Sequence, residues 1–283
     1  MAIFTLKVPQ ICYGQTTNWY KSDMSKTVVY TAIFNNYDWL KEPVVVSDGV
    51  DYICYTDSNK VKSKVWKIEI VDLNGQSPSL VNRKIKLLYP YSELSDYDYS
   101  LYIDGSMMIK KDVRSFLQKY LSDDLVMMNF RHPQNDCLFE EIRTCLKRGN
   151  ADPIMLRKQY DDYKNAGMPE HAGLSDNKII LRNHHSKLGK QLMEDWFYHV
   201  VNYSGRDQTC LSYVLYVNQV KYSFFEENIE KNPFFETWPH NTVEWYIRYW
   251  RHFKWYCERH HLLGGVISWA DKTIKPWMLE RIQ

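Results

Sequence analysis

The sequence has few of the features that place a protein in a specialised class. Its six cysteines form no CxxC pair, which argues against a disulfide framework or zinc finger and fits reduced thiols in a cytosol. Its 36 basic and 34 acidic residues leave a net charge of +2, so no overall field selects nucleic acid as a partner. We find neither a signal peptide nor a charge-free window of membrane-spanning length. We therefore expect a cytoplasmic globular protein.

Aromatic residues, in contrast, are abundant. There are 22 Tyr, 10 Trp and 11 Phe among 283 residues. Aromatic rings line carbohydrate sites because they stack on the apolar faces of sugars, but they also fill cores and interfaces. Their number alone is weak support for a sugar ligand.

The first half of the chain alternates between apolar runs and segments of helical spacing. The predicted strands cover residues 27–34, 51–57, 64–71, 98–104 and 124–130, and the predicted helices cover residues 79–89 and 113–121. The second half is more helical, with a short strand in IILRNHHS and helices over residues 185–201, from residue 205 onward and over residues 242–263. Alternating strands and helices predict an α/β fold with a mostly parallel sheet covered on both faces.

Polar loops follow four of the predicted strands. They read NNYD, YTD, DGS and NFRHPQND. Ligands of such sheets bind at the carboxyl ends of the strands, so we expect these loops to converge on one edge. We expect a main domain over residues 27–240, an N-terminal extension over residues 1–26, and an aromatic and basic helical extension over residues 241–283.

The stretch LYIDGSMMI places Asp104 at a strand end, with Ser106 two positions later. Two oxygen-bearing side chains at this spacing can bind one Mg²⁺ or Mn²⁺ and bridge it to a diphosphate. An Asp before a Gly is also commonplace in turns. On this triplet alone, the turn is the better interpretation.

Three further candidates follow the fifth predicted strand. His132, Asp136 and Glu140 lie in HPQNDCLFEE, with Asp136 and Glu140 four residues apart on the face of a predicted helix. They could bind a substrate hydroxyl or supply a base. Alternatively, Asp136 caps the helix and Glu140 is solvated.

Two basic residues and an acidic segment complete the candidate site. Arg83 and Lys86, one helical turn apart, could hold a diphosphate or contact a nucleobase, or could simply be solvated. Arg206, Asp207 and Gln208 open a predicted helix, where Asp207 could face a sugar or act only as a cap.

Several segments, taken in order, resemble a glycosyltransferase-like family that was long classed as a domain of unknown function. Its members occur in plant mucilage and cell-wall synthesis and in bacterial surface-polysaccharide clusters. The matching segments cover roughly residues 27 to 218 and read VVYTAIFNNYDWLKEP, VDYICYTD, NRKIKLLYPY, YSLYIDGSMMI, NFRHPQNDCLFEE, GLSDNKIILRNH and SGRDQTCLSYVL. The resemblance implies a GT-A-type, Rossmann-like domain that transfers a sugar from an activated donor.

The resemblance also implies roles for individual residues. The family has Asp, Gly and a non-acidic residue where other GT-A enzymes carry two acids, so a cation at Asp104 and Ser106 is an expectation only. Asp207 and Gln208 are similar to the acidic and amide motif of family 8 retaining glycosyltransferases. The KPW at residues 275–277 is similar to the region of a phosphate-contacting lysine near the C-terminus of those enzymes.

We expect transfer from a nucleoside-diphosphate sugar, UDP-linked, to a glycan or lipid-linked acceptor in capsule or lipopolysaccharide synthesis. The residues expected to contact the donor nucleotide are Thr31, Asn35, Asp38, Asp57, Arg83, Lys86 and Asp104. Those expected to contact the acceptor or sugar are His132, Glu140 and Arg206, and the catalytic candidates are Asp207, Gln208 and Asp136. Retention is favoured by the Asp207–Gln208 pair, whereas inversion would need Asp136 or Asp207 as a base. His240 could supply a metal ligand, but a histidine in a loop is usually structural or solvated, so it is not among the expected site residues.

Two alternatives remain open at the level of sequence. The chain could be a carbohydrate-binding protein that kept the fold and lost catalysis. The segment WYIRYWRHFKWYCERHH could grip nucleic acid, although the net charge counts against this, or it could lie on the inner face of an anionic membrane. An internal packing helix is the simplest interpretation of that segment.

Overall fold

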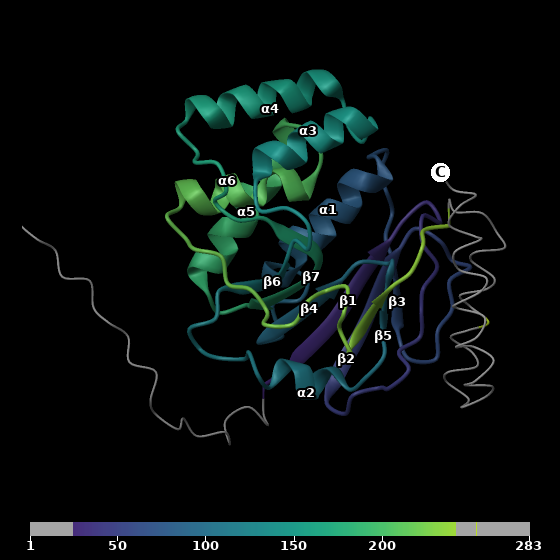
Figure 1. Ribbon diagram of the computed structural model, residues 1–283. Coiled ribbons are helices and arrows are strands. Elements are labelled where there is room, and N and C mark those ends of the chain that lie inside the picture. The colour runs from purple at the N-terminus through teal and green to yellow at the C-terminus, as the bar shows by residue number, and fades with distance from the viewer. Residues whose placement is uncertain (1–24, 242–252, 254–283) are drawn as a thin grey trace, which may run out of the picture.

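The computed structural model describes residues 25–241 and residue 253, and its centre is a six-stranded sheet (Figure 1). The strands stand in the order β3-β2-β1-β4-β7-β6, and a separate small sheet pairs β5 with β8. The bounds are β1 Thr27–Ile33, β2 Val50–Thr56, β3 Lys67–Ile70, β4 Tyr99–Ile103, β5 Met107–Ile109, β6 Met127–Arg131, β7 Ser175–Asn183 and β8 Phe235–Thr237. Strands β1 to β4 are parallel where they pair, and β7 runs antiparallel to β4 and β6. The expected mixed α/β fold with a mostly parallel sheet is confirmed.

Side chains cap the N-termini of four of the six described α-helices. The helices are α1 Pro78–Leu88, α2 Val113–Leu117, α3 Leu138–Arg148, α4 Pro153–Asn165, α5 Lys187–Asn202 and α6 Leu211–Val217, with 3₁₀ turns η2 Tyr89–Tyr91 and η3 Asp207–Thr209. Ser77 accepts a hydrogen bond from the Leu80 N–H and is followed by proline, which fits the first turn of α1. Asp152 accepts from the Ile154 N–H and caps α4 in the same way.

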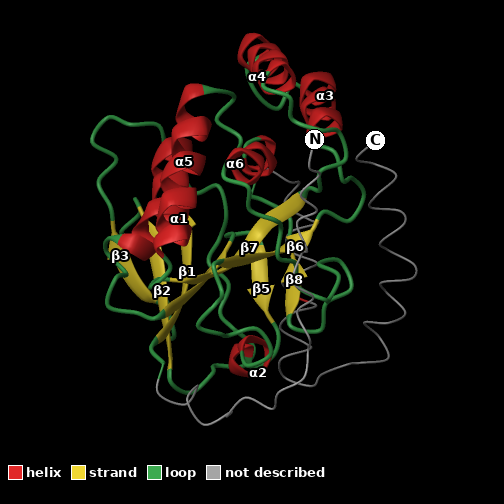
Figure 2. Cartoon of the chain, turned by 90° about the vertical axis from the view of Figure 1, so that its left-hand side faces the viewer, coloured by secondary structure: helices red, strands yellow, loops and turns green. Residues whose placement is uncertain are grey.

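Both faces of the sheet are covered by helices. On one face, α1, α5 and α6 pack around Tyr30, Ile85 and Trp196, which are fully buried. On the other face, α2 packs Phe116 against Leu101 and Phe130. Figure 2 shows α5 and α6 on the opposite side of the sheet from α2. Because β1 is shielded on both faces, all seven of its residues are buried, as its continuous apolar run predicted.

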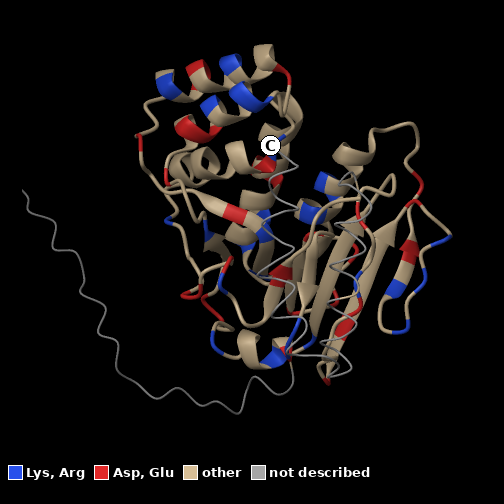
Figure 3. Cartoon of the chain, turned by 45° about the vertical axis from the view of Figure 1, so that its right-hand side comes forward, with Lys and Arg blue, Asp and Glu red and all other residues tan. Residues whose placement is uncertain are grey.

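A third cluster joins α3 to α4 beyond the sheet (Figure 1). Leu138 and Ile142 of α3 pack with Leu156 and Tyr163 of α4, and all four are almost completely buried. Both basic and acidic residues lie on the outer faces of these two helices (Figure 3). The lobe is therefore a solvated cap with an apolar interior of its own.

Several elements differ from the sequence-based expectations. The helix after the fifth predicted strand begins at Leu138, so Asp136 precedes it and does not share a helical face with Glu140; Cys137 is its N-cap residue. The strand in the IILRNHHS region begins earlier, at Ser175, and helix α2 ends earlier, at Leu117. Helix α4 and strands β5 and β8 were not predicted.

Some expectations fall outside the described residues. These include the N-terminal extension up to residue 24, the helix expected over residues 242–263, which is described only at residue 253, and the KPW segment. Within the described residues, no helix is long and apolar enough to cross a membrane.

Candidate active site

A pocket of about 670 Å³ opens at the edge of the sheet where β1 and β4 end. Because β7 is antiparallel to β4, its first residues reach the same edge. The first turns of α1, the 3₁₀ turn η3 and the loop after β6 close the sides of the pocket. Nine of the predicted site residues line it: Asn35, Asp38, Arg83, Lys86, Asp104, His132, Arg206, Asp207 and Gln208.

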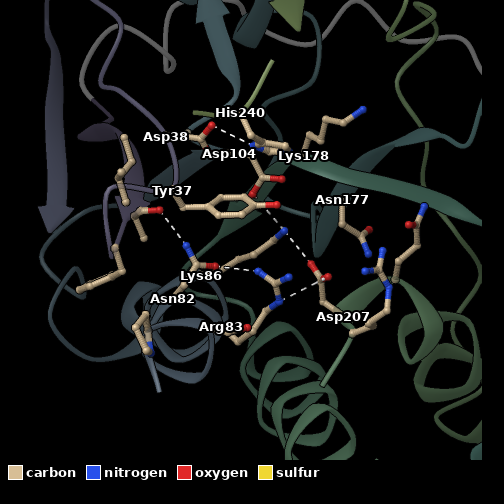
Figure 4. Close-up of a pocket in the computed structure, with 18 of the residues that line it drawn as sticks. Tyr37, Asp38, Asn82, Arg83, Lys86, Asp104, Asn177, Lys178, Asp207 and His240 are labelled. Atoms are coloured by element: carbon tan, nitrogen blue, oxygen red, sulfur yellow. Dashed lines mark hydrogen bonds and ion pairs between the residues drawn. The ribbon is translucent and has the colours of Figure 1, made fainter. Parts of the chain in front are cut away.

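Asp207 lies between two cations of helix α1 (Figure 4). Lys86 Nζ is 2.6 Å from Asp207 Oδ2, and Arg83 Nε is 3.4 Å from Asp207 Oδ1. Arg83 and Lys86 share a helix face because they are three residues apart. Burial alone would raise the pKa of the Asp207 carboxyl, but the charges of Arg83 and Lys86 outweigh it and hold that pKa well below its ordinary value. Asp207 is therefore an ionised carboxylate and a weak proton acceptor at neutral pH.

Lys86 also connects Asp207 to the end of strand β4. Its Nζ lies 3.4 Å from Asp104 Oδ1, and its side chain is only 2% exposed. The Tyr102 hydroxyl donates a 2.7 Å hydrogen bond to the same Asp104 oxygen. Burial, reinforced by the Asp104 carboxylate, raises the pKa of Tyr102 well above its ordinary value, so the phenol stays neutral and remains a donor. The pocket floor is thus one network of alternating charge.

Gly105 permits a close approach between the turn after β4 and the loop after β1. A Cβ atom at this position would lie 2.8 Å from Ile33 Cγ1 and 3.0 Å from Asp38 Oδ2. Asp38 Oδ1 in turn lies 2.9 Å from His240 Nδ1, and the His240 ring packs 4.5 Å from the ring of Tyr37. The glycine of the DGS triplet is therefore required by packing.

Asp57 and Thr31 lie behind the pocket wall. The Asp57 carboxylate accepts hydrogen bonds of 3.1 and 3.0 Å from the Asn35 N–H, while Asn35 and Asn36 adopt φ angles of 52° and 51°. Asparagine tolerates this left-handed conformation better than most residues. Thr31 is buried within β1. Neither Asp57 nor Thr31 lines the pocket. Asp57 instead holds the loop after β1, whose residue Asn35 lines it.

The far wall is built from β7 and η3. Asn177 Oδ1 accepts hydrogen bonds from Asn129 Nδ2 at 3.1 Å and from the Ser175 hydroxyl at 2.6 Å. These two donors orient the amide, and within the described part of the chain its Nδ2 has no hydrogen-bond partner. Gln208 Nε2 donates to the Ser175 carbonyl at 3.2 Å. Asn177 lines the pocket at 5% exposure, and its Nδ2 is a buried nitrogen without a partner in the described residues.

A sequence model of the TOD1/MUCI70 glycosyltransferase-like domain matches residues 15–240. The chain belongs to this family. It is 24% identical over 214 residues to "Probable hexosyltransferase MUCI70" of Arabidopsis thaliana. That match covers 66% of this chain and 36% of the plant protein, so the chain spans about a third of the length of this relative.

A likeness to a solved structure is weaker. The apo structure of the bifunctional glycosyltransferase WbbM matches with a TM-score of 0.46 and 15% identity. The match covers 71% of this chain and 39% of that chain.

Besides Thr31 and Asp57, three further residues predicted for the site of this TOD1/MUCI70 family member lie away from the pocket lining. Asp136 is exposed and lies 2.6 Å from His171 Nδ1, whose pKa it raises through their hydrogen bond. Glu140 is exposed on α3, and Ser106 is buried at 3% exposure outside the lining.

Sequence reasoning missed several lining residues. Tyr37, Asn82, Asp176, Asn177 and Lys178 all border the pocket. Asn82 Nδ2 donates to the Ala32 carbonyl and holds α1 against β1. A usable signal was the polar run SDNK at the start of an otherwise apolar strand, since charged residues within a buried strand need partners or a ligand.

The residues around Asp104 offer a divalent cation few ligands. Asp104 lines the pocket, but Ser106 does not, so the two do not form a pair of ligands facing one space. Within the described residues, no group of three His, Cys, Asp or Glu side chains could hold a metal ion. Of the expected pair, only Asp104 could contact a cation in the pocket.

Proposed function

We propose that this chain is a retaining glycosyltransferase that moves a sugar from a nucleoside-diphosphate donor to a glycan or lipid-linked acceptor. The observation that carries the proposal is the buried Asp207 carboxylate, paired with Lys86 and Arg83 inside a pocket that also presents Asp104. Membership of a glycosyltransferase-like family supports it. The name of the plant relative, a probable hexosyltransferase, agrees with a transferase.

The donor would lie across the pocket from the β1 loop to η3. Asn35, Tyr37 and Asp38 would contact the nucleoside, because they line the pocket from the loop that follows β1. The diphosphate would bind near Arg83 and Lys86, whose charges can stabilise the leaving group as it departs. The pocket volume of about 670 Å³ is within the range of small-ligand sites.

The donor sugar would then face η3 and the start of β7. The side chains of Asn177 and Gln208, which both line the pocket, would lie beside it. Asp207 would stand under the anomeric carbon, where positive charge develops as the glycosidic bond breaks. Its ionised state suits electrostatic stabilisation of that charge.

Retention is preferred because no carboxylate in the described lining is poised as a base. Four carboxylates line the pocket: Asp38 is paired with His240, Asp104 with Lys86, Asp176 with Lys178 and Asp207 with Lys86 and Arg83. Efficient base catalysis needs a pKa near the working pH, and that of Asp207 is lowered. Asp136 lies outside the lining.

A divalent cation, Mn²⁺ or Mg²⁺, is part of the proposal. The described lining carries four cationic side chains, Arg83, Lys86, Lys178 and Arg206, and four carboxylates, Asp38, Asp104, Asp176 and Asp207. The added charge of a diphosphate would thus be poorly neutralised by the protein alone. A cation held by Asp104 would supply that neutralisation.

The biological setting we propose is bacterial surface-polysaccharide synthesis at the cytoplasmic face of the membrane, with a UDP-linked donor. Its support is the resemblance of the sequence to a family with members in such gene clusters. Peripheral membrane contact through residues 241–283 belongs to the same proposal. Liposome flotation of the full chain and of a chain ending at residue 240 would test that contact.

The experiment that tests the function is a panel of nucleotide sugars incubated with the protein with and without Mn²⁺. We expect one donor to release its nucleoside diphosphate, faster with Mn²⁺, and the product to keep the anomeric configuration by NMR. Binding of sugars without release from any donor would instead favour a non-catalytic carbohydrate-binding protein. Inversion of the anomeric configuration would contradict the retaining mechanism.

A further inference from the structure

Lys41 is a buried cation in the loop that follows β1. It is 6% exposed, does not line the pocket, and forms no ion pair with a carboxylate in the described part of the chain. Burial lowers its pKa to about 8 and the nearby Asp38 carboxylate opposes this, so most of the amine is protonated at neutral pH. A buried ammonium is costly unless hydrogen bonds compensate it.

The compensating partners of Lys41 are backbone carbonyls. Its Nζ donates to the Gly105 carbonyl at 2.6 Å and to the Trp39 carbonyl at 3.1 Å. The Trp39 ring lies 5.4 Å from the same nitrogen, close enough for a cation–π contact. The short bond to Gly105 crosses between two loops that are distant in the sequence.

Gly105 is consequently held on two sides by the same loop. Ile33 and Asp38 pack against its Cα so closely that a Cβ would not fit, and Lys41 binds its carbonyl. The residue before it, Asp104, is the carboxylate that Lys86 and Tyr102 contact at the pocket floor. Any movement of Gly105 would therefore displace Asp104.

We infer that Lys41 is a positioning residue, whose ammonium holds the Asp104–Gly105 turn in the place that donor binding requires. The inference rests on the proposed function, since it assigns Lys41 to the nucleotide-sugar site. A methionine would fill a similar volume without a charge to desolvate, so packing alone does not explain a lysine at this position. What lysine adds is a donor directed at the Gly105 carbonyl.

The test compares Lys41→Met with Lys41→Arg and with a control variant in β2 that loosens the same loop. Tyr52→Phe removes a hydroxyl that accepts a 3.1 Å hydrogen bond from the Ser47 N–H, so it weakens the anchoring of this loop without touching Gly105. Each variant is titrated with UDP, GDP and ADP in Mn²⁺ by calorimetry, and its melting temperature is recorded. Lys41→Gln, which keeps a shorter donor, replaces Lys41→Met if that variant does not fold.

We expect Lys41→Met, or Lys41→Gln in its place, to weaken binding of the nucleoside diphosphate about tenfold. This is roughly the free energy that one charge-assisted hydrogen bond contributes. Lys41→Arg should recover most of the affinity, and Tyr52→Phe should bind like the wild type although it melts earlier. Wild-type affinity in a folded variant without the ammonium would overturn the inference, as would equal losses in that variant and Tyr52→Phe. If the wild type binds none of the three nucleotides, the proposed function itself fails.

Discussion

At the scale of single residues, Asp207 joins two cations on a helix that is remote in sequence. Its carboxylate contacts both Lys86 and Arg83, and its 3₁₀ turn directs it into the pocket between α1 and β7. Because its lowered pKa keeps it ionised, its contribution to transfer should depend on its negative charge.

Asp207→Asn should lower kcat for sugar transfer by about 10²- to 10³-fold, the range found when a group that stabilises developing charge is removed. Donor binding should change far less, because Arg83 and Lys86 remain to hold the diphosphate. Steady-state kinetics with the active donor, together with calorimetric binding, separates the two effects. Asp136→Asn is the matched control, since Asp136 lies outside the pocket, and full activity in Asp207→Asn would refute the role of the carboxylate.

His184 should make stability depend on pH. Burial lowers the pKa of His184 to about 4, while an unfolded histidine titrates near 6.5. Between these values the unfolded chain binds a proton that the folded chain does not, so the stabilisation is complete above pH 6.5 and is lost as the pH falls towards 4. Urea unfolding of the wild type and of His184→Asn should differ in slope over this window, with up to about 3 kcal/mol lost only in the wild type. Parallel slopes would contradict this assignment.

At the scale of elements, the turn after β4 and the loop after β1 form one rigid corner of the pocket. Gly105→Ala would place a methyl group 2.8 Å from Ile33 Cγ1 and 3.0 Å from Asp38 Oδ2. We expect about 1–3 kcal/mol of lost stability, as for other overpacked sites, and weaker binding of the donor. Thermal unfolding and nucleotide titration measure the two effects.

Gly149→Asn is the control for that substitution. Gly149 ends α3 in the left-handed region at φ 65°, and no atom lies within 4 Å of a Cβ built there. Asparagine tolerates this conformation, so the variant should lose little stability and no donor affinity. A Gly105→Ala variant that behaves like Gly149→Asn would show that the corner is not tightly packed.

Elements with strong local signals were predictable from the sequence. Strand β1 is one apolar run, and the start of α1 is indicated by the capping residue Ser77 and by Pro78. Strands β5 and β8 have only three residues each and pair although they are far apart in the sequence, so no local pattern reveals them. Helix α4 buries Gln159 beside Leu156 and Tyr163, and a polar residue on its inner face blurs the apolar periodicity.

The candidate site was predictable only in part, for the same reason. The rule that parallel strands end at one edge brought Asn35, Asp38 and Asp104 together correctly. It did not reveal that Asp207 would pair with Lys86, nor that Asn177 would be oriented by Asn129, because these contacts join distant segments. The polar side chains of β7 were missed because that strand was expected to begin after them.

At the scale of the whole molecule, the described residues by themselves enclose a pocket. Every described residue that lines it lies between Ala32 and His240, and Asn241 Nδ2 donates to the Asn36 carbonyl beside it. A chain that ends after Asn241 should therefore bind the nucleoside diphosphate within about threefold of the full chain, a difference below 1 kcal/mol. Titration calorimetry of both chains checks this, and loss of binding in the shorter one would show that residues beyond 241 contribute.

The two sides of the pocket come from separate stretches of the chain, because β7 runs antiparallel to β4. The proposed nucleotide side is built by β1, α1 and the turn after β4, whereas Asp176, Asn177 and Lys178 enter from the opposite strand direction on a separate stretch of chain. Exchanging that short stretch between homologues would alter the preferred saccharide while leaving the choice of nucleotide intact. Donor selectivity in such a scaffold could thus diversify by changes in one strand start.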